Sequence, residues 1–211
     1  MTNHSTSVAD AVQQLIRAGS EIVQSGLALA SAGNLSIRLD VDRFVVTASG
    51  TWLNRLDETS FTIMDLDGNV IDGATKPSSE WKLHQRAYRA RPDVGSIVHV
   101  HPAHAILLDA LRRPIRLVTL DHAYYVGSVG RTPYYPNGSD ELADTAAEQL
   151  AEHNCVIMGN HGSTTVGDDC DMALRRALNL ENAAELTYRA LLAGDGDLDF
   201  PWESEPHLHH A

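Results

Sequence analysis

The sequence predicts an α/β protein in which helices pack on a largely antiparallel sheet. Strand-like segments occur in adjacent pairs joined by short polar turns, which is typical of antiparallel hairpins. Helical segments of apolar period 3.6 are mixed with these pairs, which favours such a sheet over a doubly wound parallel one. The 211 residues contain no internal repeat and no long linker. We therefore expect one domain over 1–211, with a flexible tail from about residue 195.

Apolar periodicity and turn residues give the expected order of elements. The first part contains a helix over 10–30 broken or ended near Gly26, strands over 35–39 and 44–48, and a hairpin of 61–66 with 70–71. The middle contains a helix from 78 to 91, a strand over 95–101, a helix over 103–111 and a strand over 116–120. The last part contains a helix over 139–153, a strand over 155–158, and a helix from Asp168 or Asp169 to about 192. In the helix from 78, a serine is expected as N-cap with Glu80 in the first turn.

Charge and cysteine content restrict the partners and the compartment. The net charge of −12 disfavours nucleic acid and anionic membranes, because both need a basic face. The polar N-terminus lacks a secretory apolar segment, and no apolar run reaches the roughly 20 residues of a membrane span. We expect a cytoplasmic protein in which Cys155 and Cys170 are buried rather than joined in a disulfide.

Two histidines are spaced so that they can share one metal ion. His99 and His101 alternate with valines in an expected strand, and strand residues i and i+2 point to the same face. Their Cα atoms would lie roughly 6–7 Å apart, which lets both imidazoles reach one ion. A paired surface or packing role remains the alternative for this motif alone.

A third ligand must come from elsewhere, and His161 is the best candidate. It lies in a glycine-rich turn directly after a buried apolar strand, where functional side chains are commonly displayed. Glu80 could be a fourth ligand or an unligated acid/base beside the metal. Three histidines with an open position describe a catalytic zinc site. The other histidines are expected to be structural or at the surface, and the tail ones are excluded from the site: His84, His104, His122, His153, His207, His209 and His210.

Three motifs together resemble the class II aldolase/adducin family, and closely its L-fuculose-1-phosphate aldolase branch. The motifs are Ser78-Ser79-Glu80-Trp81, Arg91-Pro92-Asp93 and His99-Val100-His101, and the resemblance extends from Gly33-Asn34 to the helix after His161. It implies a three-layer α/β/α fold around a mixed, mostly antiparallel sheet. It also implies a homotetramer with active sites between neighbouring subunits.

The resemblance assigns roles to the candidate residues. It implies zinc on His99, His101 and His161, with Glu80 as both metal ligand and acid/base. Manganese or cobalt could replace zinc at such a nitrogen and oxygen site. It also implies that the substrate phosphate is held by Gly33, Asn34, Ser49, Gly50, Ser78 and Ser79. Glycines let backbone N–H groups approach an anion closely, and serines at a helix start add donors. Ordinary turn and cap roles are the alternative for each of these residues.

The resemblance implies reversible cleavage of a phosphorylated ketose into dihydroxyacetone phosphate and an aldehyde, with Glu80 moving the C3 proton. One feature departs from the aldolase pattern, which uses tyrosines from a mobile C-terminus and from the segment after the strand histidines. Here the last tyrosine is Tyr188, and we expect Tyr124 or Tyr125 to reach a neighbouring subunit's site.

Other members of the family compete with the aldolase interpretation. A 3-oxo-tetronate 4-phosphate decarboxylase uses the same metal site, and the segment from Pro133 to Gly138 also resembles that branch. A ribulose-phosphate 4-epimerase is less favoured, because that branch prefers Asp at the position of Glu80. A methylthioribulose-phosphate dehydratase spaces its histidines differently. A non-catalytic adducin-like interaction domain would have lost the three histidines that this chain keeps.

Overall fold

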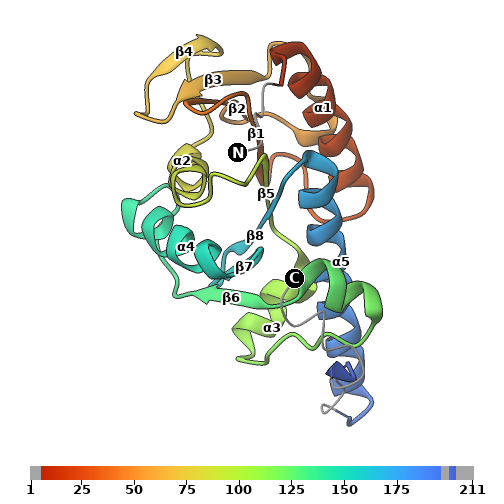
Figure 1. The fold of residues 1–211 in the computed structure, drawn as a ribbon. Helices are drawn as coiled ribbons and strands as arrows, with labels where there is room; N and C mark the ends of the chain where they lie inside the picture. The colour runs from red at the N-terminus through yellow and green to blue at the C-terminus, as the bar shows by residue number, and fades with distance from the viewer. Residues whose placement is uncertain (1–5, 196–199, 203–211) are drawn as a thin grey trace.

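An eight-stranded sheet forms the centre of the computed structural model, which describes residues 6–195 and 200–202 (Figure 1). The strand order is β4-β3-β2-β1-β5-β8-β7-β6, and only the β6–β7 pair is parallel. The expected mixed, mostly antiparallel sheet is thus confirmed. The strands are β1 (Asn34–Arg38), β2 (Arg43–Thr47), β3 (Phe61–Asp65), β4 (Val70–Gly73), β5 (Ser96–Val100), β6 (Val129–Thr132), β7 (Cys155–Met158) and β8 (Gly162–Gly167).

Helices cover both faces of this sheet. On one face lie α1 (Val8–Gln24) and α5 (Cys170–Leu192), and on the other lie α2 (Trp81–Ala90) and α4 (Asp140–Glu152) (Figure 1). The short helix α3 (Ala103–Ala110) packs against α5. A 3-10 turn η1 (Leu53–Arg55) packs on α1, and a π-helical turn η2 (His122–Val126) packs on α5. This arrangement confirms the three-layer α/β/α fold.

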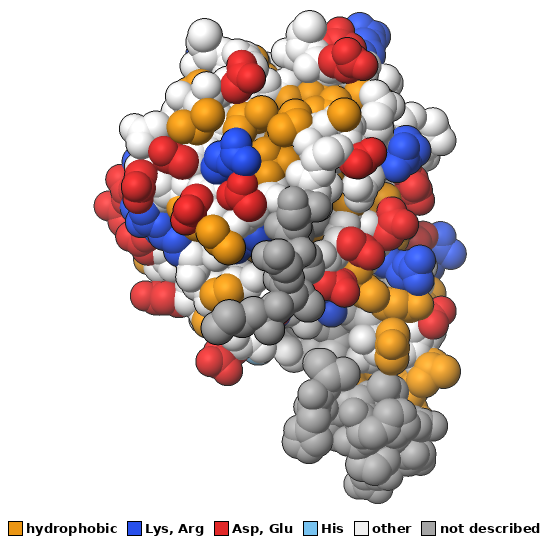
Figure 2. Space-filling view, turned by 45° about the horizontal axis from the view of Figure 1, so that its top comes forward, with side chains coloured by type: hydrophobic (Ala, Val, Ile, Leu, Met, Phe, Trp, Pro, Cys, Tyr) orange, Lys and Arg blue, Asp and Glu red, His pale blue; other side chains and the backbone are white. Residues whose placement is uncertain are grey.

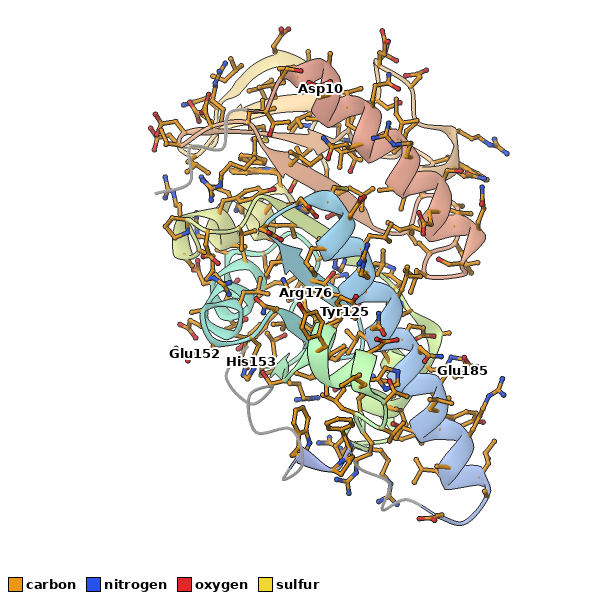
Figure 3. The ribbon with its side chains drawn as sticks, turned by 45° about the vertical axis from the view of Figure 1, so that its right-hand side comes forward. Asp10, Tyr125, Glu152, His153, Arg176 and Glu185 are labelled. Carbon is orange, nitrogen blue, oxygen red and sulfur yellow. The ribbon has the colours of Figure 1, made fainter. Side chains whose placement is uncertain are left out.

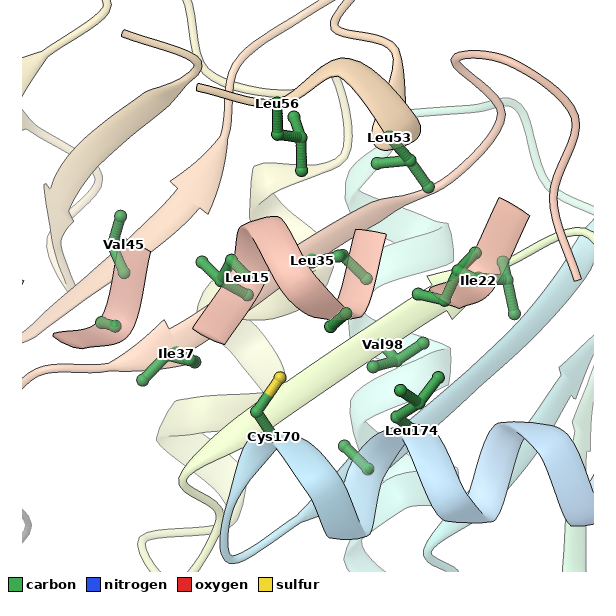
Figure 4. Packing of buried hydrophobic residues seen from close by; sticks show 14 of the residues in the cluster. Leu15, Ile22, Leu35, Ile37, Val45, Leu53, Leu56, Val98, Cys170 and Leu174 are labelled. Atoms are coloured by element: carbon green, nitrogen blue, oxygen red, sulfur yellow. The ribbon is translucent and has the colours of Figure 1, made fainter. Parts of the chain in front are cut away.

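Each face of the sheet has its own apolar core. Leu15 and Ile22 of α1 and Leu174 of α5 meet Val98 on one face (Figure 4). Each such fully buried side chain stabilises the fold by about 1.5–3 kcal/mol relative to exposure. On the opposite face, a second cluster includes Ile97 of the central strand. Ile97 and Val98, which are neighbours in β5, therefore point to opposite faces of the sheet.

Alternation along β1 and β5 decides which polar groups face α2. Leu35 and Ile37 of β1 pack in the α1–α5 core, so Asn34 and Ser36 point to the side of α2. In β5, His99 lies on the same side because Val98 packs in the α1–α5 core. Both faces of β1 are buried, so its polar residues are enclosed by α2 instead of facing water.

The segment 116–120 does not form the expected strand. The backbone N–H of Arg116 donates to Thr187 Oγ1 of α5 at 2.9 Å, so this segment is bonded to a helix instead of a sheet. The edge of the sheet is taken by β6, which pairs in parallel with β7. Neither β6 nor β8 was expected, because glycines at positions 130, 162 and 167 weaken their strand patterns.

The start of α2 also differs from the expectation. Glu80 itself is the N-cap residue, with no side-chain capping bond, and the helix begins at Trp81. The N–H of Ser78 donates to Thr47 O at the end of β2 at 3.0 Å, which places Ser78 two residues before the N-cap. Glu80 consequently sits in the turn before the helix, where its N–H bonds Ser78 Oγ at 3.2 Å.

The surface charges agree with the net negative charge of the sequence. The face in Figure 2 carries many acidic side chains with basic ones scattered among them. Among residues 6–195 and 200–202, no helix is long and apolar enough to cross a membrane.

Cys155 and Cys170 are buried and unpaired, as expected. Burial raises the pKa of Cys155 to about 12 and that of Cys170 to about 11, so both thiols are inert packing groups.

Candidate metal centre and adjoining cavity

Two histidines converge at the carboxyl end of β5. His99 is fully buried within the strand, and His101 follows directly after the last strand residue. Their Nε2 atoms are 3.1 Å apart, and their ring centroids are 5.0 Å apart. The i, i+2 spacing thus brings both imidazoles to one point even though His101 lies just beyond the strand.

The turn between β7 and β8 brings the third histidine to the same point. The His161 ring lies 5.0 Å from that of His99 and 5.1 Å from that of His101. Asn160 before it has a left-handed φ of 52°, which reverses the chain within two residues. A Cβ atom at Gly162 would lie 2.5 Å from Val100 O and 2.7 Å from His101 Cδ2. Only glycine leaves room for the rings at this position.

Glu80 completes the cluster from the turn before α2. Its Oε2 lies 3.2 Å from His99 Nε2 and its Oε1 lies 3.3 Å from His161 Nε2. The Asn34 amide donates to Oε2 at 2.9 Å. Oε1 is buried and has no hydrogen-bond partner among the described residues. A buried carboxylate oxygen without a donor is costly, and a cation among these four side chains would satisfy it.

Protonation of the cluster suits metal binding. His99 Nδ1 lies 3.0 Å from Ser163 O, which can only accept, so Nδ1 holds the proton and Nε2 presents its lone pair. Burial, helped by the neighbouring histidines, lowers the pKa of His101 to about 4 and also lowers that of His161. Burial alone would raise the pKa of Glu80, but His99, His161 and Asn34 hold it well below its usual value.

The distances in the cluster match the size of a small divalent ion. Four donors about 2.1 Å from a tetrahedral ion lie about 3.4 Å from each other. The separations of 3.1, 3.2 and 3.3 Å are close to this, and the ligand atoms of all four residues lie within 4.8 Å of one another. The nitrogen and oxygen donor set fits zinc, manganese or cobalt. The residues present therefore fit the metal that the sequence predicts.

A cavity of about 110 Å³ adjoins this cluster. Glu80 and His101 line it on one side. All six residues predicted to hold phosphate also line it: Gly33, Asn34, Ser49, Gly50, Ser78 and Ser79. Three segments far apart in sequence thus meet at one opening beside the cluster. No Lys or Arg lines this cavity among the described residues, so its donors are backbone N–H groups, hydroxyls, the His101 imidazole and two side-chain amides.

The cavity has a further wall that the site prediction did not include. Asn137 lines it, in the segment from Pro133 to Gly138 that resembles the decarboxylase branch. Gly138 holds this segment close to Ser79, because a Cβ there would lie 2.6 Å from Ser79 O. The Pro-Asn-Gly sequence marks a turn, but nothing in the sequence says that this turn reaches the cavity.

The predicted tyrosines lie away from the cavity within one chain. Tyr124 is 55% exposed, and Tyr125 packs on α5. Figure 3 shows Tyr125 beside Arg176, whose Nε donates to the Tyr125 backbone oxygen at 3.1 Å. Their role as proton donors in a neighbouring subunit stays a prediction.

The other histidines described by the structure have partners outside the cluster. His84 is the exception in position, because it lies next to the cluster behind Asn34. The tail histidines lie outside the described residues. The remaining three described histidines each make a hydrogen bond away from the cluster. His104 contacts Glu181 at 2.8 Å, His122 contacts Asn182 at 3.0 Å and His153 contacts Ser128 at 2.7 Å.

Fold and site define a member of the class II aldolase/adducin family. Residues 13–188 match the family described as "Class II Aldolase and Adducin N-terminal domain". The chain belongs to this family, and the sequence resemblance is confirmed. Class II aldolases depend on a metal, which agrees with the cluster of three histidines and a glutamate.

Individual relatives carry related names. The chain is 33% identical to L-fuculose phosphate aldolase of Methanocaldococcus jannaschii, over 85% of this chain and 97% of that protein. It is 31% identical to 3-oxo-tetronate 4-phosphate decarboxylase of Haemophilus influenzae, over 82% of this chain and 85% of that one. A solved L-fuculose 1-phosphate aldolase superposes with a TM-score of 0.86 at 29% identity, over 98% of this chain and 97% of that one.

Proposed function

We propose that this protein is a metal-dependent lyase that reversibly cleaves a phosphorylated ketose into dihydroxyacetone phosphate and an aldehyde. One observation carries the proposal. Glu80 and His101 belong to the histidine cluster and also line the cavity where the predicted phosphate-holding residues meet. A substrate with its phosphate in this cavity would place its carbonyl carbon beside the cluster.

The residues have distinct duties in this reaction. A zinc ion on His99, His101 and His161, or manganese or cobalt in its place, would supply Lewis-acid polarisation of the substrate carbonyl. Glu80 takes the proton from the substrate C3 in the condensation direction and returns it in cleavage. Its Oε1 has no hydrogen-bond donor among the described residues, so that oxygen can contact the metal or, when released from it, take the proton.

The phosphate would be held without a basic side chain of the same subunit. Gly33 and Gly50, with φ of 108° and 79°, expose backbone N–H groups in turns beside the cavity. Ser78 and Ser79 add hydroxyl groups, and Asn34 and Ser49 complete the wall. The positive charge of the bound metal would offset part of the negative charge of the phosphate.

The complete site is proposed to lie between subunits of a homotetramer in the cytoplasm. Neither Tyr124 nor Tyr125 lines the cavity of its own chain, whereas the exposed Tyr124 ring is free to meet another subunit. We infer that one of these tyrosines donates the proton to the aldehyde oxygen in the neighbouring site. Residues 1–211 act as a single domain in this assembly.

A second candidate reaction is decarboxylation of a 3-oxo-tetronate 4-phosphate. It is favoured by Asn137, which lines the cavity within the segment that resembles that branch, and by the 31% identical relative of that name. The same polarised carbonyl would then stabilise loss of carbon dioxide. A phosphate-bearing substrate and a bound metal are common to both reactions.

Product analysis separates the two reactions. The protein with bound zinc is incubated with L-fuculose 1-phosphate and, separately, with a 3-oxo-tetronate 4-phosphate. The proposal expects dihydroxyacetone phosphate from the first substrate, and release of carbon dioxide from the second alone would overturn it. Glu80→Gln should still hold the metal on the three histidines, with weaker affinity, but lose proton exchange at C3, with Glu148→Gln on the exposed side of α4 as control. A full cleavage rate in Glu80→Gln would mean that the assigned base is wrong.

A further inference from the structure

A row of buried hydrogen bonds leads from Glu80 into the space between β1 and α2. The Asn34 amide donates to Glu80 Oε2 at 2.9 Å, and its Oδ1 lies 2.5 Å from His84 Nε2. On the other side of the ring, His84 Nδ1 lies 2.6 Å from Ser36 Oγ. Ser36 Oγ in turn lies 2.8 Å from the Tyr88 hydroxyl. All five side chains are buried.

The carboxylate fixes the direction of the bonds up to His84, and the neutral His84 ring fixes the direction of the others. A carboxylate only accepts, so Asn34 must turn its NH₂ to Glu80 and its Oδ1 to His84. His84 Nε2 must then carry the proton. Burial lowers the pKa of His84 to about 3, so the ring is neutral and Nδ1 is an acceptor. Ser36 therefore donates to Nδ1, and the Tyr88 hydroxyl donates to Ser36.

We propose that His84 is a positioning residue, which, with Ser36, holds the Asn34 amide in the orientation that donates to Glu80. A reversed Asn34 amide would set its oxygen against the carboxylate and remove the 2.9 Å hydrogen bond to Glu80 Oε2. Asn34 also lines the cavity, so the hydrogen bonds that orient its amide also fix one wall of the predicted phosphate site. Histidine and serine are needed here for their hydrogen-bond direction as well as for filling space.

The inference rests on the proposed function for its role in catalysis, but its test does not need catalysis. Cobalt(II) is titrated into metal-free protein, and its d–d absorption gives the dissociation constant. The variants are His84→Leu, Asn34→Ala, their double variant, and His84→Gln. Loss of a hydrogen bond behind a metal ligand typically weakens metal affinity 10–100-fold.

The expected result is coupling between His84 and Asn34. Each single variant should weaken cobalt binding about tenfold, and the double variant should be no weaker than either, because His84 acts through Asn34. His84→Gln should stay near wild type, because its amide still donates to Asn34. Multiplied losses of about a hundredfold in the double variant would overturn the inference. So would a His84→Gln protein that binds as weakly as His84→Leu.

A second pair of variants covers the case in which His84→Leu does not fold. Ser36→Ala removes the donor to Nδ1, so the ring proton is no longer held at Nε2, and cobalt binding should weaken several-fold. Tyr88→Phe also removes one buried hydroxyl but leaves Ser36 donating to His84, so cobalt binding should be unchanged. Equal effects of both changes would refute the positioning role. If coupling holds but neither sugar substrate reacts, the proposed function fails while this inference stands.

Discussion

Gly162 opens β8 between two of the clustered histidines, and Gly162→Ala tests whether their packing sets the metal site. An added Cβ would lie 2.7 Å from His101 Cδ2, whereas ordinary contacts begin at 3.4 Å. His101 or the strand must therefore move by about 0.7 Å. Metal–ligand distances tolerate deviations of only about 0.2 Å. The displacement is larger than this tolerance, so the cluster should lose much of its affinity.

The expected loss is at least about tenfold in cobalt or zinc affinity, as for other changes that misplace a ligand. The same Cβ would also lie 2.5 Å from Val100 O, and overpacking of this kind typically costs 1–3 kcal/mol of unfolding free energy. Metal affinity is measured by competition with a chromophoric chelator. The unfolding free energy is measured on metal-free protein in urea.

Gly130→Ala provides the matched control. Its Cβ would also lie 2.7 Å from a histidine Cδ2, but that histidine is His153, which is not in the cluster. The neighbours at Gly130 are side chains of His153 and Gln149, which can shift. Metal affinity should be unchanged in this variant. Equal metal affinities of the Gly162→Ala and Gly130→Ala proteins would refute the argument that glycine is required for the geometry of the cluster.

Three further changes test other parts of the structure. In the unfolded state His84 is protonated below about pH 6.5, whereas in the folded state it stays neutral down to about pH 3. The free energy of unfolding therefore decreases as the pH is lowered. Urea unfolding of metal-free protein should therefore show an extra loss of about 1.4 kcal/mol per pH unit between pH 6 and 4, which His84→Gln removes. The Asn160 N–H donates to Asp109 Oδ2 at 3.0 Å, and Asp109→Ala removes this acceptor. The variant should lower the unfolding free energy by about 1–3 kcal/mol and loosen the turn before His161. An unchanged metal affinity would contradict the predicted loosening of the turn. Ser139→Ala removes the cap bond to Leu142 N and should lower the unfolding free energy by about 1 kcal/mol without affecting metal binding.

Local sequence patterns determined the elements of this protein where the pattern and the fold agree. Ser139 and Asp169 cap helices as expected, because each side chain bonds an N–H within its own first turn. The convergence of His99 and His101 follows from their i, i+2 spacing at the end of β5. Segment 116–120 has an apolar pattern suited to a strand, but the backbone N–H of Arg116 donates to Thr187 of α5. No local sequence pattern predicts this contact.

Only the tertiary structure decided what surrounds these elements. β1 alternates polar and apolar residues, a pattern typical of a strand with one wet face, but α2 buries that face and joins Asn34 and Ser36 to His84. The turn at Asn137 likewise reaches the cavity only because β6 and α4 place it there. Alternation specifies which residues share a face of a strand. What covers that face depends on contacts between residues about 50 positions apart, and these form only when the whole sheet and its helices pack.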